Sequence, residues 1–570
     1  MDKRIFLAIA LSLAVIITYK LFFAKPQVPP AQAPSTQAPQ APPTQTAKPS
    51  QQTAQPAKAT VATPAPTQKI AVAKGTNAGS TQDITVETVK YTAIFSTRGG
   101  ALKSFQLKGY QKNCTECADD IYPHLKNLFT GSKERLLSKN KDFIELVDVK
   151  EGMPYPLAIT FPGSSVDIAP DSIYETAPTN LDLTNTSGKR ELVFSQTFDN
   201  VVKVEKIFTF NPLNYTISLD IKVHNLTDSP LTQIPKLSWQ QYADPNVKED
   251  SYDHHGPVAS IAKYVERRSL KELDKEKIYG PNVLWGGYES KYFIASFIPG
   301  NQSATRVIMN RDTNNMVSVS IDGQKEIIPG RQNGSFNYTL YLGPKVYNLL
   351  KLHNVGLEDS IDFGSWLKVL AIPLLLVLNF IHNYIPNYGV AIILLTLLIK
   401  IIFWPLGNIS YKSMQKMQML QPQIAALKGK YINDKNKLNQ ETMGLYRAHK
   451  INPFGGCLPL LIQIPIFFGL YKALLYSIEL RHSPFFGWIQ DLSAYDPYYI
   501  TPIIMGATQF IQQKTTPTLT NPVQAKMMLV MPVIFTFIFL SFPSGLVIYW
   551  LFNNIFSIAQ QYHINKKLGR

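Results

Sequence analysis

Polar side chains inside apolar segments are the residues most able to do chemistry in this sequence. Lys400 lies in the apolar stretch 397–405, with Thr396 one helical turn earlier on the same face. The next two apolar segments contain the polar residues Gln463, Thr508 and Gln509. A cation at the centre of a membrane helix costs roughly 2.5–3.5 kcal/mol, so such residues indicate a polar cavity or hydrogen bonds between helices. A wet groove open to the cytoplasm is the simplest account, although Lys400, four residues before Trp404, could also extend to the membrane surface.

Two residue pairs could form a disulfide or a metal site. Cys114 and Cys117 form a C-x-x-C motif, which in an exported domain most simply indicates a possible local disulfide. His254 and His255 have no third ligand at a useful spacing, so we expect a loop and no metal site. The sequence contains no nucleotide-binding loop and no catalytic set, so we expect neither a cofactor nor enzyme activity.

Charge and hydropathy divide the chain. The net charge is +16, and residues 361–570, the most apolar third, carry +11 of it. A soluble nucleic-acid-binding protein would place this charge on a polar face, so we expect no specific nucleic acid recognition. Positive charge between apolar segments instead favours a membrane protein whose basic loops face one side of the bilayer.

Residues 1–25 predict a membrane anchor. A charged start precedes an apolar run at 5–24, which is long enough for about one bilayer crossing. Phe22 and Phe23 precede Ala24, so the small residues expected at a cleavage site are missing. We therefore favour an uncleaved signal anchor over a cleaved signal peptide, and either would export the residues that follow.

Residues 26–82 predict a disordered linker rich in Pro, Ala and Gln. Eleven of the residues at 26–66 are Pro, and such a composition cannot bury a core. The pattern then changes to alternating apolar and polar residues, which predicts a large all-β sandwich at 83–360. Residues 201–210 and 215–223 have a strand–turn–strand signature, and residues 316–321 and 335–342 repeat it around Asp322-Gly323.

The C-terminal third contains apolar segments at residues 366–381, 388–406, 457–476, 498–511, 527–541 and 545–559. The loop at 407–454 carries eight Lys/Arg and two acidic residues, so the positive-inside rule places it in the cytoplasm. With a cytoplasmic N-terminus, only one of the first two segments can then span the membrane. We assign 366–381, which contains Lys368 and Pro373, to an interfacial amphipathic helix within 361–386.

The predicted fold is therefore an all-α polytopic bundle joined to a large all-β sandwich. It has six transmembrane helices, five of them in a C-terminal core at 387–570, and a cytoplasmic helical hairpin at 407–454. Apolar residues recur along the first arm of this hairpin at helical spacing, at Met414, Met417, Leu420, Ile424, Leu427 and Tyr431. This stripe either packs the two hairpin helices together or forms a Met-rich docking surface for flexible apolar clients.

A series of short motifs connects these segments to a known family. In order they are Asn387-Tyr-Gly-Val390, Trp404-Pro405-Leu406, Met419-Leu-Gln-Pro422, Asn452-Pro-Phe-Gly-Gly-Cys457, Leu461-Ile-Gln463-Ile-Pro465, Asp491-Leu-Ser493, Asp496-Pro-Tyr-Tyr499, Met531-Pro-Val-Ile-Phe535 and Phe542-Pro-Ser-Gly-Leu546. They closely resemble the YidC family of membrane protein insertases. The anchor, linker and sandwich resemble its Gram-negative form, including Arg98-Gly-Gly100 and Gly286-Gly287.

The resemblance implies a five-helix core with a hydrophilic groove, open to the cytoplasm and to lipid, in which a cation receives the acidic tail of an incoming protein. Lys400 is at the matching position, where family members usually have Arg, so the charge is kept but the bidentate fork is lost. Trp550, beside Tyr549, matches the client-contacting aromatic residue of the last helix. Without the resemblance, this pair would equally well be an aromatic anchor at the membrane interface.

The resemblance also implies a location and partners. The protein is expected to be a multi-pass protein of the bacterial inner membrane, with both termini cytoplasmic and the large domain periplasmic. Its expected partners are nascent membrane proteins, the Sec translocon, the lipid bilayer, and ribosomes or targeting factors at the cytoplasmic loops. The alternative function is an envelope-assembly scaffold or a folding chaperone that acts through the periplasmic domain.

Overall fold

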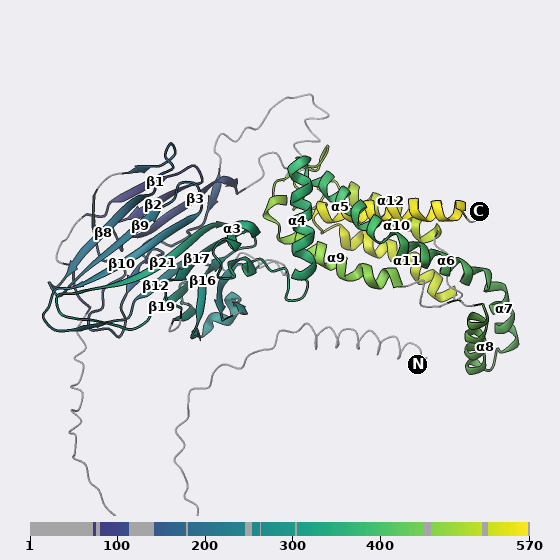
Figure 1. Cartoon of the computed structure of the whole chain (residues 1–570), viewed down its shortest axis with the longest axis horizontal. Helices are drawn as coiled ribbons and strands as arrows, with labels where there is room; N and C mark the ends of the chain where they lie inside the picture. Colours follow the sequence, from purple (N-terminus) through teal and green to yellow (C-terminus); the bar gives the residue numbers. More distant parts are fainter. Residues whose placement is uncertain are drawn as a thin grey trace, which may run out of the picture. The chain divides into compact units, whose positions relative to one another are not determined.

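The computed structural model describes residues 72–75, 80–112, 142–177, 180–244, 254–262, 264–302, 305–449, 451, 458–515 and 522–567. The predicted anchor at 1–25, most of the linker at 26–82, and the Cys114 and Cys117 pair lie outside these residues. Strands make up the first part of the described chain and helices the second (Figure 1). The expectation of a strand-rich domain followed by a helical region is therefore confirmed.

The described strands form three larger sheets and one strand pair. The nine-stranded sheet contains, in spatial order, β14 (Tyr264–Arg267), β13 (Gly256–Ile261), β16 (Val283–Glu289), β17 (Phe293–Pro299), β21 (Asn333–Pro344), β10 (Thr216–Asn225), β9 (Val202–Phe210), β8 (Arg190–Phe198) and β6 (Glu175–Thr176). One five-stranded sheet contains β4 (Phe143–Glu145), β3 (Ala101–Gln111), β2 (Tyr91–Ser96), β1 (Asp83–Glu87) and β7 (Leu181–Asp182). The other contains β15 (Lys277–Tyr279), β18 (Arg306–Arg311), β19 (Met316–Asp322), β12 (Lys236–Tyr242) and β5 (Ile159–Thr160), and the pair is β11 (Leu231–Gln233) with β20 (Glu326–Ile328).

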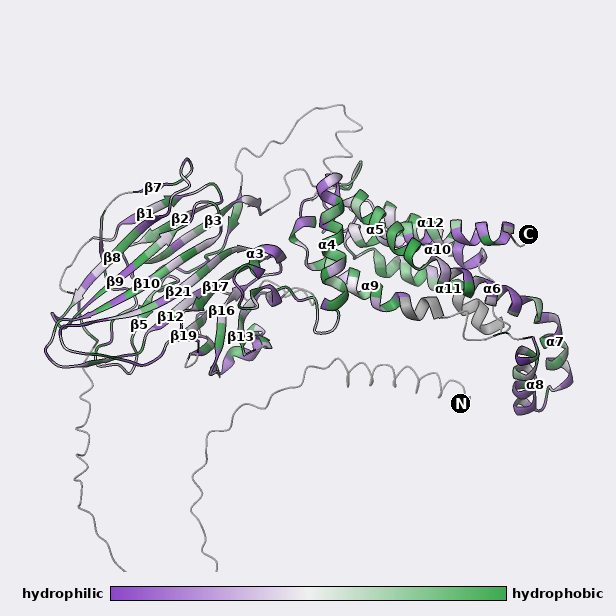
Figure 2. Ribbon diagram, viewed as in Figure 1, coloured by the Kyte–Doolittle hydropathy of each residue, from purple (hydrophilic) through white to green (hydrophobic). Residues whose placement is uncertain are grey.

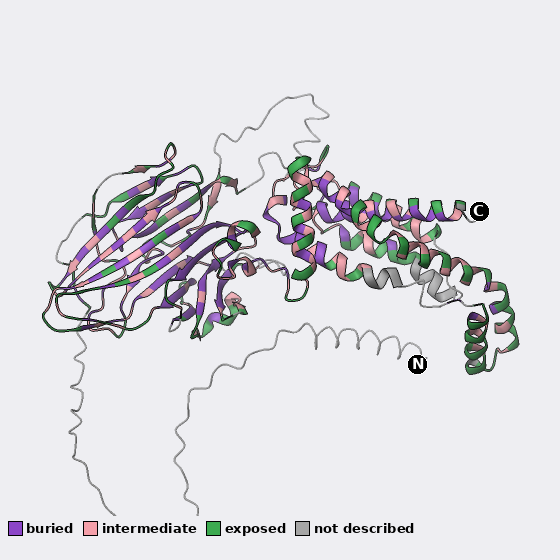
Figure 3. Cartoon of the chain, in the orientation of Figure 1, coloured by how far each residue is buried: buried purple, intermediate pink, exposed green. Residues whose placement is uncertain are grey.

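Alternating side chains build the core of these sheets. In β9 every second residue is buried, as the period-two pattern in the sequence predicts (Figure 3). The rings of Phe95, Phe194, Phe208 and Phe210 meet between the sheets, with Phe95 and Phe208 centroids 4.8 Å apart. Among the described strands the pairing is antiparallel, except that β1 and β7 run parallel.

The first predicted strand–turn–strand unit is present, and the second is wrong. β9 and β10 pair in antiparallel register, with Phe210 opposite Ile217. β19 and β21 do not pair with each other, because β19 lies between β12 and β18, whereas β21 lies between β10 and β17. Alternation identifies a strand but not its neighbour, and here β20 follows the Asp322-Gly323 segment and pairs with β11 instead.

The Arg98-Gly99-Gly100 turn lies over a buried lysine. Gly99 and Gly100 have φ angles of 76° and 49°, which favour glycine. The Lys206 side chain is 0% exposed, and its Nζ donates hydrogen bonds to the carbonyl oxygens of Gly99 (3.0 Å), Gly100 (2.6 Å) and Leu157 (2.7 Å). An ammonium has three N–H donors and can make all three hydrogen bonds at once, whereas a neutral amine has two.

Several helices after the sheets, including α4 and α5, consist mainly of hydrophobic residues (Figure 2). A short α3 (Tyr347–Lys351) precedes the helical region, which contains α4 (Lys368–Tyr384), α5 (Tyr388–Ile402), α6 (Trp404–Met419), α7 (Gln421–Lys430), α8 (Lys435–Ala448), α9 (Leu458–Tyr476), α10 (Ile500–Thr515), α11 (Pro522–Phe539) and α12 (Ser544–Lys567). α12 packs against α5 and α10, α4 packs against α9 and α5, and α10 packs against α11.

Among the described helices, none alone combines the length and the hydropathy needed to cross a bilayer, and only α5 and α6 pass together, as a pair bent by 63°. The predicted segment 388–406 therefore does not form one continuous helix. The helix α5 ends at Ile402, and α6 begins at Trp404 with Pro405 in its first turn. Proline has no N–H to donate to the preceding turn, and this explains the break.

The helix α4 and the pair formed by α7 and α8 can be compared with the sequence predictions. α4, predicted to be amphipathic, exposes an apolar face: Val369 is 72% exposed and Phe380 is 59% exposed, whereas Leu375 is buried. α7 and α8 pack against each other through a buried cluster formed by Leu420, Ile424, Tyr446 and Ile451. This cluster supports the interpretation that the hydrophobic stripe holds the two helices together.

Candidate functional site

Lys400 lies in the last turn of α5 and faces α12. Asn387 caps the start of α5 by accepting a hydrogen bond from the N–H of Val390 at 3.0 Å, and α5 packs on α12. The Lys400 Nζ donates a hydrogen bond to the Ser557 Oγ at 2.7 Å. The Ser557 hydroxyl donates in turn to the backbone carbonyl of Asn553 at 2.7 Å. These contacts favour a role between helices over extension of Lys400 to a membrane surface.

The charge of Lys400 has no counter-ion among the described residues. The acidic residues of the helical region are engaged elsewhere: Asp362 pairs with Lys472 at 3.3 Å, and the buried Asp496 accepts hydrogen bonds from the N–H and the hydroxyl of Thr501. A half-buried ammonium with only a hydroxyl partner creates a positive potential in a medium of low dielectric constant. Such a site attracts an incoming carboxylate.

Gln463 joins the same polar set from α9. Its Nε2 donates to the Asn553 Oδ1 at 3.0 Å, and its side chain also hydrogen-bonds with the Tyr549 hydroxyl. Asn553 therefore connects Gln463 of α9 to Ser557 and, through it, to Lys400 of α5. The structure thus brings together two residues that the sequence placed on separate helices.

Thr508 and Gln509 of α10 form a second group against α12. The Trp550 Nε1 donates to the Gln509 Oε1 at 3.1 Å, and the Asn554 Nδ2 lies 3.4 Å from the Thr508 Oγ1. These contacts fix α10 to α12 and do not reach Lys400.

Thr396 takes no part in this network. Its side chain is fully buried, and its hydroxyl donates to the carbonyl of Ile392 in the same helix at 2.6 Å. Threonine often satisfies its hydroxyl in this way inside membrane helices. The geometry therefore places Thr396 in the α5 packing surface.

Tyr549 and Trp550 lie in an aromatic cluster. Tyr549 is 1% exposed, and the Trp550 ring lies 4.8 Å from the Phe467 ring and 5.2 Å from the Phe539 ring, measured between centroids. Trp550 is only half-buried, so one part of its ring remains accessible. Among the two, Trp550 is the residue that an apolar client could contact.

The polar residues of α12 were missed by the sequence analysis. Asn553, Asn554, Ser557, Gln560 and Gln561 are all between 2% and 8% exposed. Beyond the bonds already described, the Gln560 Nε2 donates to the Trp404 carbonyl (3.1 Å) and the Gln561 Oε1 accepts from Thr515 (3.1 Å). Their spacing of three and four residues along one helix face was the available sequence signal.

The other candidate pair shows no sign of metal binding. The His254 ring contacts the Pro257 carbonyl at 3.2 Å, and the His255 ring lies edge-on to Tyr288. Within the part of the chain that the structure describes, no group of three His, Cys, Asp or Glu residues is placed to hold a metal ion.

Comparison with known proteins decides the family. The model of the "60Kd inner membrane protein" matches residues 380–570, and the model of the "YidC periplasmic domain" matches residues 133–377. A protein of Syntrophus aciditrophicus (strain SB) named membrane protein insertase YidC is 55% identical over 573 residues, covering 100% of both chains. The chain belongs to the YidC family.

A second relative by sequence agrees with this assignment. The YidC insertase of Geobacter sp. (strain M21) is 42% identical, over 85% of this chain and 86% of its own. A solved structure of an active YidC insertase, with its first transmembrane domain resolved, is 23% identical over 86% of this chain and 95% of its own, with a TM-score of 0.35. In this YidC-family chain, the strand-rich part falls largely within the match to the periplasmic domain, and Lys400 falls within the match to the inner membrane protein.

Proposed function

We propose that this YidC-family chain is a membrane protein insertase that captures the hydrophilic tail of a nascent inner-membrane protein at Lys400. The client's apolar segment then passes into the lipid, with the insertase acting alone or beside the Sec translocon. The observation that supports this mechanism is the Lys400 ammonium, hydrogen-bonded to Ser557 between α5 and α12 and without a carboxylate partner among the described residues.

Electrostatics can supply the driving force without covalent chemistry. A carboxylate about 4 Å from a cation gains on the order of 4 kcal/mol at an intermediate dielectric constant, which helps an acidic tail to leave water. An outside-positive potential then favours export of that tail by roughly 2.3 kcal/mol per charge per 100 mV. The polar side chains of α12 would replace part of the tail's hydration during this step.

The proposed topology follows the distribution of charge. We propose six membrane crossings with both termini in the cytoplasm and the strand-rich domain in the periplasm. The proposed segments are the anchor at 1–25, the linker at 26–82, the periplasmic domain at 83–360, the interfacial helix at 361–386 and the five-helix core at 387–570 with its cytoplasmic hairpin at 407–454. The hairpin exposes Lys412, Lys416 and Lys430, which would suit a ribosome or a targeting factor.

The decisive experiment reverses the charge at Lys400. Lys400→Glu should abolish insertion of a client with an acidic exported tail, whereas Lys400→Arg should retain it, because the tail needs a cation. Insertion would be measured by protease protection in reconstituted vesicles. Lys514→Glu is the matched control, because this substitution makes the same change of charge at an exposed position at the end of α10. Normal insertion by Lys400→Glu would exclude capture at this residue.

A further inference from the structure

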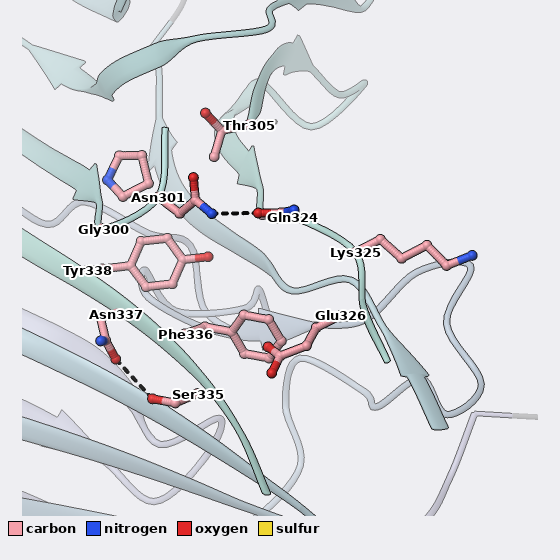
Figure 4. A pocket seen from close by; sticks show the side chains of 12 residues that line it. Gly300, Asn301, Thr305, Gln324, Lys325, Glu326, Ser335, Phe336, Asn337 and Tyr338 are labelled. Atoms are coloured by element: carbon pink, nitrogen blue, oxygen red, sulfur yellow. Dashed lines mark hydrogen bonds between the residues drawn. The ribbon is translucent and has the colours of Figure 1, made fainter. Parts of the chain in front are cut away.

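The strand-rich domain contains a pocket of about 500 Å³ that the insertion mechanism does not use. It lies where the end of β17, the segment after β19, the start of β20 and the middle of β21 come together (Figure 4). The side chains that matter for its chemistry are Asn301, Gln324, Glu326, Phe336 and Tyr338. These residues come from separate strands and loops within residues 299–338, which the fold brings together.

One face of β21 forms the floor of the pocket. Gly334, Phe336 and Tyr338 alternate along the strand and therefore share this face. A Cβ atom placed on Gly334 would lie 3.1 Å from the Glu326 Oε1, so the carboxylate of Glu326 lies directly over this end of the same face. The Glu326 carboxylate, the Phe336 ring and the Tyr338 phenol therefore lie in this order along the floor of the pocket.

The Tyr338 hydroxyl points into the pocket (Figure 4). Tyr338 is only 4% exposed, yet its hydroxyl has no hydrogen-bond partner among the described residues. The hydroxyl of Tyr341, three residues later, donates to the Pro344 carbonyl at 2.6 Å, whereas the buried hydroxyls of Tyr91 and Tyr174 have no partner among the described residues. A buried tyrosine normally satisfies its hydroxyl, so the free group at Tyr338 is available to a ligand.

Glycine keeps the space beside this hydroxyl open. A Cβ atom at Gly323 would lie 3.3 Å from the Tyr338 Oη and 2.6 Å from the Cγ of Pro235. Any larger residue at position 323 would therefore crowd the wall next to the hydroxyl. The space beside the Tyr338 hydroxyl therefore depends on glycine at position 323.

The charge inside the pocket is negative. Glu326 is half-buried and has no ion-pair partner among the described residues, and burial raises the pKa of its carboxyl group. Lys325 also lines the pocket, but its side chain is exposed and extends away from the other lining residues, whereas Asn301 and Gln324 hydrogen-bond to each other (Figure 4). A partly desolvated carboxylate without a counter-ion favours a cationic ligand and disfavours an anionic one.

We propose that this pocket binds a primary ammonium group, with Glu326 as counter-ion, the Phe336 ring as the cation–π surface and the Tyr338 hydroxyl as hydrogen-bond acceptor. A lysine side chain on an extended polypeptide and a free alkylamine both carry this group.

The test compares two side chains that differ in charge. Nα-acetyl-lysine amide and the uncharged Nα-acetyl-norleucine amide would be titrated against the full chain in lipid nanodiscs at about pH 8, where a carboxyl group is ionised, with binding followed by ligand-observed NMR. The lysine derivative should bind at least about tenfold more tightly, as a hydrogen bond to a charged group predicts. Cadaverine gives the comparison with a free amine: stronger binding of the lysine derivative assigns the site to polypeptides, and the reverse assigns it to small amines.

Three variants test the assigned roles. Glu326→Gln should weaken binding of the lysine derivative about tenfold, and Tyr338→Phe should weaken it about threefold by removing one hydroxyl. Lys325→Gln is the matched control and should not weaken binding, because Lys325 lines the pocket but its ammonium group extends away from the other lining side chains (Figure 4) and removing it takes away a positive charge. Equal binding of the lysine and norleucine derivatives, or unchanged binding by Glu326→Gln, would overturn the proposal. None of these variants should alter insertion that depends on Lys400, so the two proposals can fail separately.

Discussion

At the scale of single residues, the buried Lys206 side chain stabilises the strand-rich domain through its hydrogen bonds. Lys206→Met keeps the approximate volume but leaves the carbonyl oxygens of Gly99, Gly100 and Leu157 without their donor. Because each orphaned buried acceptor costs about 1–3 kcal/mol, we expect a loss of at least about 3 kcal/mol in the free energy of unfolding. Hydrogen exchange of the β-strand amides in the full chain, followed by mass spectrometry, would measure it. Unchanged protection would show that the three contacts are not stabilising.

Lys206 also predicts a pH dependence. Burial lowers the pKa of Lys206 to about 7, whereas an unfolded lysine titrates near its ordinary value of 10.5. Between these values the unfolded chain binds more protons than the folded chain, so the folded domain should gain stability as pH rises from about 7 to about 10, by up to about 1.4 kcal/mol per pH unit. The three carbonyl acceptors oppose this shift, since they favour the ammonium. A pH series of hydrogen exchange should show the rise in the natural chain and lose it in Lys206→Met.

Sequence reasoning reached some of these residues and not others, for a physical reason. Lys400 and Gln463 stood out because each is a polar side chain within an apolar segment. Asn553 and Ser557 were not singled out, although they also lie within an apolar segment, 545–559. Only the pairing of helices shows that they face inward.

At the scale of elements, close contact between α10 and α11 depends on Gly506. A Cβ atom at this position would lie 1.9 Å from the Thr536 Oγ1, so Gly506→Ala should force the two helices apart and cost about 1–3 kcal/mol. Gly444→Ala is the matched control in α8, because a Cβ there meets open space and alanine favours helix by about 1 kcal/mol. Thermal unfolding of the detergent-solubilised chain should therefore shift down for the first variant and not for the second. A stable Gly506→Ala protein would show that α11 can move without loss.

Element boundaries were the least predictable part of the fold. The span at 388–406 was expected to be continuous, yet the helix ends at Ile402, because Pro405 stops the hydrogen-bond ladder and starts α6. α12 continues to Lys567, beyond the apolar segment that ends at 559, because its polar residues are satisfied by neighbouring helices. In both cases the helix boundary depends on a feature that hydropathy does not describe: a proline for α5, and contacts with neighbouring helices for α12.

At the scale of the whole molecule, the insertase and the periplasmic scaffold differ in which part of the chain they need. The network around Lys400 involves only α5, α9 and α12 in its direct contacts. A chain in which residue 82 is joined directly to residue 361 would keep this network, together with the Asp362–Lys472 ion pair that links the segment before α4 to α9. It would lose every described strand from β1 to β21.

We expect this shortened chain to insert a client with an acidic exported tail, because capture by Lys400 needs none of the deleted residues. Insertion would be measured by protease protection in two sets of vesicles, one with the full chain and the other with an equal amount of the shortened chain. Adding Lys400→Glu to the shortened chain should abolish the signal, which separates capture at Lys400 from leakage through a damaged bundle. A shortened chain that is folded but inactive, while the full chain with Lys400→Glu stays active, would contradict the insertase mechanism and favour a function based on the strand-rich domain. The insertase mechanism thus predicts that activity needs Lys400 and not the strand-rich domain, whereas the scaffold function predicts the reverse.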